Sequence, residues 1–117
     1  MKAGEGRFLI TTVERDGRWV ATAARRDTGQ RFGIDVAAQT EEHARAALER
    51  WLAWQGEHEG ALEALREAEH AYHRTIARSA FVSATQGPIA LERQKESLAR
   101  VEASRARLEE VRARQPS

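Results

Sequence analysis

The sequence contains no cysteine, which excludes disulfide bonds, thiolate metal sites and cysteine nucleophiles. Long apolar runs are missing too: no segment approaches the ~20 apolar residues that a helix needs to cross a bilayer. Neither sign of charge dominates, since 19 Lys and Arg stand against 18 Asp and Glu. We therefore expect a cytoplasmic protein without membrane spans and without the strong positive field of proteins that coat nucleic acid.

Signatures of catalysis are scarce. No serine stands in a nucleophile-elbow pattern, and the glycines form neither a phosphate-binding loop nor a dinucleotide fingerprint. The nearest approach to a metal site is Glu67, His70 and His73, because residues three apart share one helical face. Glu-rich helix surfaces produce such spacings by chance, so we interpret these three as solvated residues and weak metal candidates. We expect a protein that is not an enzyme and that holds no cofactor.

Residues 7–38 show the alternation and the turn signals of three antiparallel strands. Asp16-Gly17 favours a type I′ turn, because both central residues of that turn need a positive φ. With this pair as the loop, Val13 lies opposite Val20, and the register of the first hairpin is fixed.

A second turn around residues 27–30 predicts a third strand, in which Ala21 lies near Val36 and Ala23 near Ile34. One face of the resulting meander is the face that we expect a helix to cover, and it carries Phe8, Ile10, Trp19, Ala21, Ala23, Phe32, Ile34 and Val36. The other face is apolar as well, and it includes Leu9, Val13, Val20 and Gly33.

Thr40 is followed by two glutamates, a pattern that predicts the start of a helix. Gly56 and Gly60 weaken the helical pattern, and we expect a kink or a close contact there before the helix continues to about Val82. Pro88 then opens a second helix to about residue 114. The predicted fold is thus α+β, a three-stranded antiparallel meander followed by a long antiparallel helical hairpin, with residues 1–55 as a head and 56–117 as an arm that packs separately or as one domain with it.

The apolar stripe of the second helix is thin, and the antiparallel pairing of the two helices places Glu69 near Arg105. Apolar residues that lack cover indicate a homo-oligomer or a protein partner. We therefore favour a non-enzymatic interaction or adaptor protein. Its predicted partner-binding residues are Leu91, Leu98, Val101, Leu108 and Val111 on the helix, and Val13 and Val20 on the outer sheet face.

The arginines of the meander support an alternative, a DNA-binding accessory or regulatory protein. Antiparallel strands can enter the major groove of DNA, where arginine contacts phosphates and guanine edges. The candidate residues are Arg15, Arg18, Arg26 and Arg31.

The run Asp16-Gly17-Arg18-Trp19, together with Phe32, Thr40-Glu41-Glu42, Ala44 and Trp51-Leu52, resembles the arm-type, AP2-like DNA-binding module of phage integrases. The resemblance covers residues 7–54 and implies a three-stranded sheet backed by a helix. The same order of three strands and a helix also resembles the HicB-type antitoxin module. No recombinase domain follows in this sequence, so the resemblance implies a fold rather than an activity.

Overall fold

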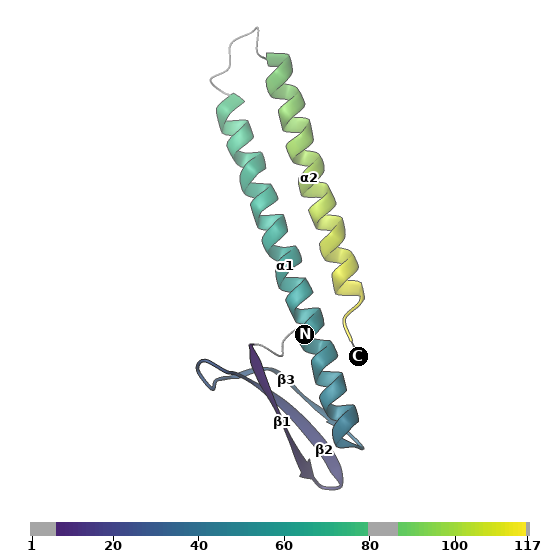
Figure 1. Ribbon diagram of the computed structural model, residues 1–117. Helices are drawn as coiled ribbons and strands as arrows, with labels where there is room; N and C mark the ends of the chain where they lie inside the picture. Colours follow the sequence, from purple (N-terminus) through teal and green to yellow (C-terminus); the bar gives the residue numbers. More distant parts are fainter. Residues whose placement is uncertain (1–6, 80–86, 117) are drawn as a thin grey trace. The chain divides into compact units, whose positions relative to one another are not determined.

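The computed structural model describes residues 7–79 and 87–116, and Figure 1 shows the order of its elements. The described chain begins with three strands, β1 (Phe8–Arg15), β2 (Arg18–Arg25) and β3 (Arg31–Ala38). Two helices follow, α1 (Glu41–Ser79) and α2 (Gly87–Ala113). The predicted α+β class and the β-β-β-α-α order are confirmed. The predicted end of the first helix at Val82 lies outside the described residues.

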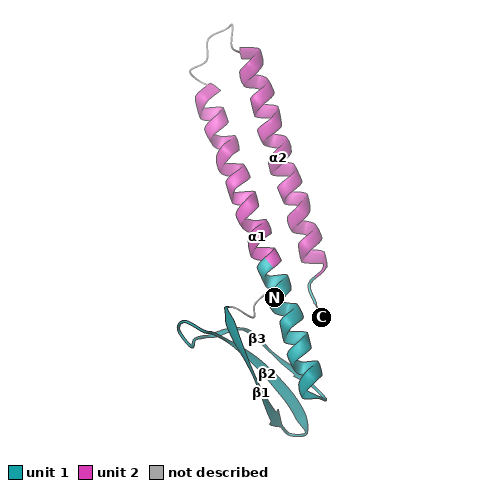
Figure 2. Ribbon diagram, viewed as in Figure 1, with its two compact units in different colours: residues 1–56, 115–117 teal, residues 57–114 magenta. Residues whose placement is uncertain are grey.

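The chain forms two compact units (Figure 2). The first holds the sheet and α1 up to Gly56, and the second holds α1 from Glu57 together with α2 up to Arg114. Among the described residues, no helix combines the length and the apolar composition that crossing a membrane requires.

The first hairpin forms as its turn residues dictate. Asp16 and Gly17 have φ values of 54° and 77°, in the left-handed region that the tight turn needs. Val13 therefore pairs with Val20 and the whole predicted register of β1 on β2 is confirmed.

The third strand departs from the predicted register after Ala21. Ala21 does pair with Val36, but Ala23 pairs with Phe32 instead of Ile34, so β3 has extra residues between these two pairs. Gly33 lies in this bulge with a φ of 77°, a conformation that glycine adopts without steric cost. The predictions for two residues were wrong as a result, because Ile34 is 46% exposed and Gly33 faces the ring of Trp51.

The core of the first unit lies between the sheet and the first turns of α1. Its buried residues are Phe8, Ala21, Ala23, Ala44, Leu48 and Leu52, and partly buried aromatic rings surround them. Phe8 and Phe32 stack with ring centroids 4.5 Å apart, and Trp51 meets Phe32 edge-on at 6.4 Å. The small side chains of Ala21 and Ala23 on β2 leave room for these rings between the sheet and the helix.

Helix α1 begins as predicted, because the hydroxyl oxygen of Thr40 accepts a hydrogen bond of 3.1 Å from the backbone N–H of His43. The helix then continues without interruption through Gly56 and Gly60. A Cβ at either glycine would meet no atom within 4 Å, so the predicted close contact at this point was wrong.

Candidate functional site

The outer face of the sheet exposes large apolar side chains. Leu9 is 49% and Val13 is 54% exposed on β1, and Val20 beside Val13 on β2 is only half-buried. Leu9 and Val13 are four residues apart on one strand, so their side chains point to the same face. This face of the first unit is uncovered in the described part of the chain.

In the second unit, α1 and α2 pack along a seam whose residues recur at alternating spacings of three and four. The seam positions are all buried or half-buried: His58, Ala61, Leu65, Ala68, Tyr72, Thr75 and Ser79 on α1, and Ala90, Gln94, Ser97, Val101, Ser104, Leu108 and Val111 on α2. Leu62, Glu69 and Ala71 of α1 are half-buried beside the seam. The seam becomes polar toward the Ser79 end of α1. The Gln94 side-chain amide donates to Ser79 Oγ at 2.7 Å, and the hydroxyls of Thr75 and Ser97 are 3.2 Å apart.

The predicted partner-binding residues of α2 fall into two groups. Val101, Leu108 and Val111 are buried in the seam, so the chain itself covers them. Leu91 and Leu98 lie beside the seam and are 53% and 39% exposed.

Leu91 and Leu98 share one flank of the hairpin with Ile76 of α1, which is 42% exposed. The ion pair between Glu69 and Arg105, at 3.7 Å, identifies this flank, because Glu69 is seven residues before Ile76 and Arg105 is seven after Leu98. The predicted proximity of Glu69 and Arg105 is thereby confirmed. We call Ile76, Leu91 and Leu98 the apolar flank.

The four predicted DNA-contacting arginines are exposed, but they lie in two separate places. Arg15 and Arg18 pair across the first turn, at one end of the hairpin. Arg26 follows the last residue of β2, and Arg31 begins β3 opposite Ala24, so both lie near the second turn at the other end of the sheet. The sheet therefore does not bring the four together.

Arg31 is engaged by a neighbour on its own strand. Its guanidinium donates a hydrogen bond to the carboxylate of Asp35 and forms an ion pair with it. The hydrogen bond and the charge of Asp35 raise the pKa of Arg31, and the hydrogen bond from Arg31 holds the pKa of Asp35 below its usual value.

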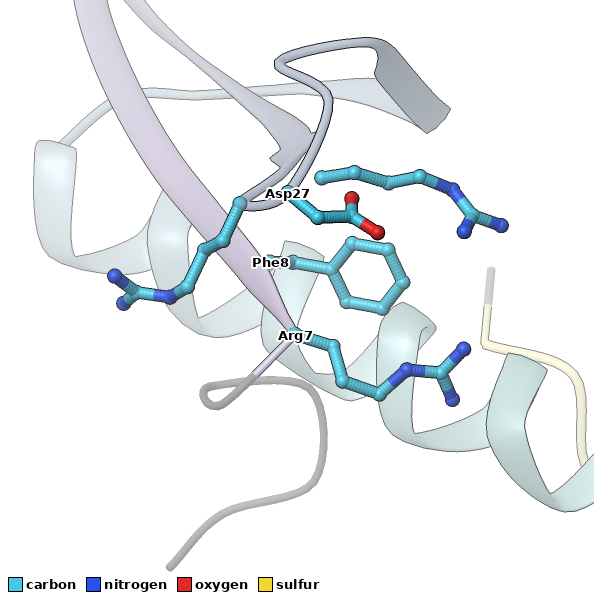
Figure 3. Close-up of a pocket in the computed structure, with 5 residues that line it drawn as sticks. Arg7, Phe8 and Asp27 are labelled. Atoms are coloured by element: carbon cyan, nitrogen blue, oxygen red, sulfur yellow. The ribbon is translucent and has the colours of Figure 1, made fainter.

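Near the second turn, side chains line a hollow of about 260 Å³ (Figure 3). The lining residues are Arg7, Phe8, Arg25, Arg26 and Asp27. Figure 3 shows the side chains of Arg7 and Asp27 around the ring of Phe8. The guanidinium carbon of Arg7 is 5.6 Å from the centre of that ring, and that of Arg25 is 5.5 Å from the ring of Phe32.

Sequence reasoning did not select Arg7 and Arg25 as candidates. The usable signal was their place in the predicted meander, where Arg7 directly precedes Phe8 and Arg25 pairs with Phe8, because guanidinium groups pack on the faces of aromatic rings. The hollow combines three cations with one carboxylate, so it suits an anionic group better than a cation.

The weak metal candidates are on the surface of α1. Glu67, His70 and His73 are all exposed, and the ring of His73 lies 6.1 Å from that of Tyr72. Within residues 7–79 and 87–116, no three side chains of His, Cys, Asp or Glu are grouped so that they can hold a metal ion.

Comparisons with known proteins add no family to this description. No family model, curated protein or solved structure matches the chain. The resemblance of residues 7–54 to the integrase arm-type module therefore stays a prediction.

Proposed function

We propose that this protein is a non-enzymatic interaction module that associates with a second copy of itself, or with a partner protein, through its helical hairpin and the outer sheet face. The observation that carries the proposal is the grouping of exposed apolar side chains. Single exposed apolar residues are common on protein surfaces, but here Leu9 and Val13 share a strand face, and three more residues form the apolar flank. Ile34 and Ile89 are exposed as well, Ile89 on the other flank of α2.

The seam of the hairpin supports the same proposal. In our interpretation the alternating spacing of three and four is that of a short antiparallel coiled coil. Its polar residues Thr75, Ser79, Gln94 and Ser97 leave little apolar area inside the seam at that end. The apolar flank lies beside these residues, so a partner helix packed on the flank would add the apolar contact that the seam lacks.

Sedimentation velocity between about 1 and 100 µM tests self-association. We expect the wild-type protein to sediment faster as its concentration rises, and Leu91→Glu with Leu98→Glu to weaken this association at least tenfold, because charges on the flank have to be desolvated. Ala99→Glu with Ala106→Glu, which adds two charges at exposed positions elsewhere on α2, is the matched control and leaves association unchanged. A strictly monomeric protein at tens of micromolar contradicts self-association.

The arginine-lined hollow favours a second candidate function, binding of nucleic acid by the sheet. Three arginines around one hollow are suited to phosphate groups. Fluorescence anisotropy of a labelled DNA duplex at about 50 mM salt tests it. We expect Arg26→Ala to weaken binding and Arg50→Ala, which removes one exposed charge from α1, to leave it unchanged. No binding by the wild-type protein at this salt concentration excludes the candidate.

A further inference from the structure

Charged residues form an ordered row along α1 in the second unit. Glu63, Glu67, Arg74 and Arg78 are all exposed, and at 3.6 residues per turn they fall within about 60° of the helix circumference. The row faces away from the seam with α2. We call these four residues the charge row.

The order of the charges along the row is self-complementary. Glu63 and Arg78 are equally far from the midpoint between His70 and Ala71, and so are Glu67 and Arg74. Two copies of α1 that cross antiparallel at this midpoint place each acid of one copy opposite a base of the other. Four ion pairs result, two from each half of a two-fold symmetric contact.

The residues beside the charge row share this symmetry. Ala64 and Ala77 are also equally far from the midpoint, and both are exposed. Ala71, next to the midpoint, is another small residue. His70, on the other side of the midpoint, is exposed and lies within about 20° of the row, so this crossing also brings the His70 rings of the two copies together.

The charge row is also available for a partner. Most of the ion pairs among described hairpin residues are made elsewhere, between Arg105 and Glu69, Arg107 and Glu110, Arg112 and Glu109, and Arg114 and Glu57. Within the described part of the hairpin, no ion pair includes Glu67, Arg74 or Arg78. Glu63 reaches Arg66 at 3.6 Å, but both side chains are more than 60% exposed, and such pairs contribute little to stability.

From this order we infer that α1 of a second copy packs antiparallel on the charge row, so that Glu63 and Glu67 of each copy contact Arg78 and Arg74 of the other. The inference rests on the proposed self-association and adds to the apolar flank a second contact between copies, on the opposite side of α1 from Ile76, with a stated orientation. Nucleic acid suits the row less well, because two of its four charges are carboxylates. The order of charges in the row is complementary to itself, so a second copy of α1 matches it, whereas an unrelated helix would match it only by chance.

Reversal of the charges in two variants tests the orientation. Variant A carries Arg74→Glu and Arg78→Glu, so its row is entirely acidic, and variant B carries Glu63→Arg and Glu67→Arg, so its row is entirely basic. Each variant alone is expected to associate at least tenfold more weakly than the wild type, because every cross-copy pair becomes repulsive. An equimolar mixture of A and B is expected to form heterodimers at least as tight as the wild-type dimer. Wild-type dimers are expected to weaken between about 50 and 500 mM salt, because these pairs are exposed to solvent.

Two variants on α2 control for net charge. Lys95→Glu with Arg100→Glu matches the charge change of variant A, and Glu92→Arg with Glu96→Arg matches that of variant B; all four residues are exposed and outside the row. Circular dichroism confirms that each variant is folded. Both control variants are expected to dimerise like the wild type.

The outcomes separate this inference from the proposed function. If the wild type associates but A and B associate equally well alone, or if their mixture forms no heterodimers, the charge row is not the interface and self-association by another surface stands. If A loses binding of duplex DNA while its α2 control keeps it, and mixing with B restores no association, the row is part of a surface for nucleic acid and the inference is wrong. If the wild type stays monomeric throughout, the self-association itself is refuted.

Discussion

The indole of Trp51 occupies the space that a side chain at Gly33 would need. A Cβ on Gly33 would overlap Cζ3 of Trp51 and lie 2.9 Å from Cη2, closer than real contacts allow. The backbone of Gly33 has a φ of 77°, in the left-handed region, which residues with a side chain adopt only at a cost in free energy. The bulge in β3 and the position of the helix on the sheet thus depend on the same residue.

Gly33→Ala is therefore expected to destabilise the first unit. Gly29 provides the matched control, because it has a φ of 74° but no atom within 4 Å of a Cβ. Gly29→Ala is expected to cost about 1–2 kcal/mol for the backbone conformation alone. Gly33→Ala is expected to cost about 1–3 kcal/mol more, for the overlap with Trp51. Urea unfolding measures both, and equal losses for the two variants would contradict the contact.

At the glycines inside α1, replacement by alanine is expected to raise the free energy of unfolding. Gly56 and Gly60 are helical, and a Cβ on either would meet no atom within 4 Å. Replacement by alanine lowers the entropy of the unfolded chain without a steric cost, so each substitution is expected to stabilise the helix by about 0.5–1 kcal/mol. Thermal unfolding followed by circular dichroism at 222 nm is the measurement. A lower melting temperature for Gly60→Ala would show that the glycine has a packing role absent from the described contacts.

Two glycines of the sheet, Gly17 and Gly33, show how far the sequence predicts the fold. The Asp16-Gly17 pair specified the first hairpin completely, because a two-residue turn leaves a single register. The predicted register of β3 is wrong at the bulge that contains Gly33, because a prediction from strict alternation of side chains does not include the extra residues of a bulge. An isolated glycine within a strand was the available sign of that bulge.

The hairpin was predicted less well at its surface than in its topology. Apolar size is a poor guide to the seam, because Leu91 and Leu98 lie beside it and at their level the seam consists of Ala90, Gln94 and Ser97. Burial on a helix depends on angular position rather than on hydrophobicity, and a polar seam position that finds a hydrogen-bond partner is stable there.

The ion pair of Arg31 and Asp35 predicts a pH dependence. Because the hydrogen bond from Arg31 lowers the pKa of Asp35 in the folded state, the contribution of this carboxylate to stability is present above the ordinary pKa of aspartate. It is lost as the pH falls through the lowered value. In an NMR titration, Arg31→Ala is expected to move the Asp35 pKa upward toward its ordinary value, and an unchanged titration curve would contradict the pair.

Leu108 is 3% exposed and Leu98 is 39% exposed. Substitution of Leu108 is therefore expected to affect mainly the stability of the hairpin, and substitution of Leu98 mainly self-association. Leu108→Ala leaves a cavity in the seam and is expected to lower the free energy of unfolding by about 2–4 kcal/mol. Leu98→Ala removes a side chain that water already reaches, so a loss below about 1 kcal/mol is expected. Self-association should show the reverse order: Leu98→Ala weakens it, and Leu108→Ala leaves it unchanged as long as the hairpin is folded. Urea unfolding at a concentration where the protein is monomeric, combined with sedimentation velocity, separates the two effects. A large loss of stability in Leu98→Ala would mean that this residue holds the hairpin together and is not part of a docking surface.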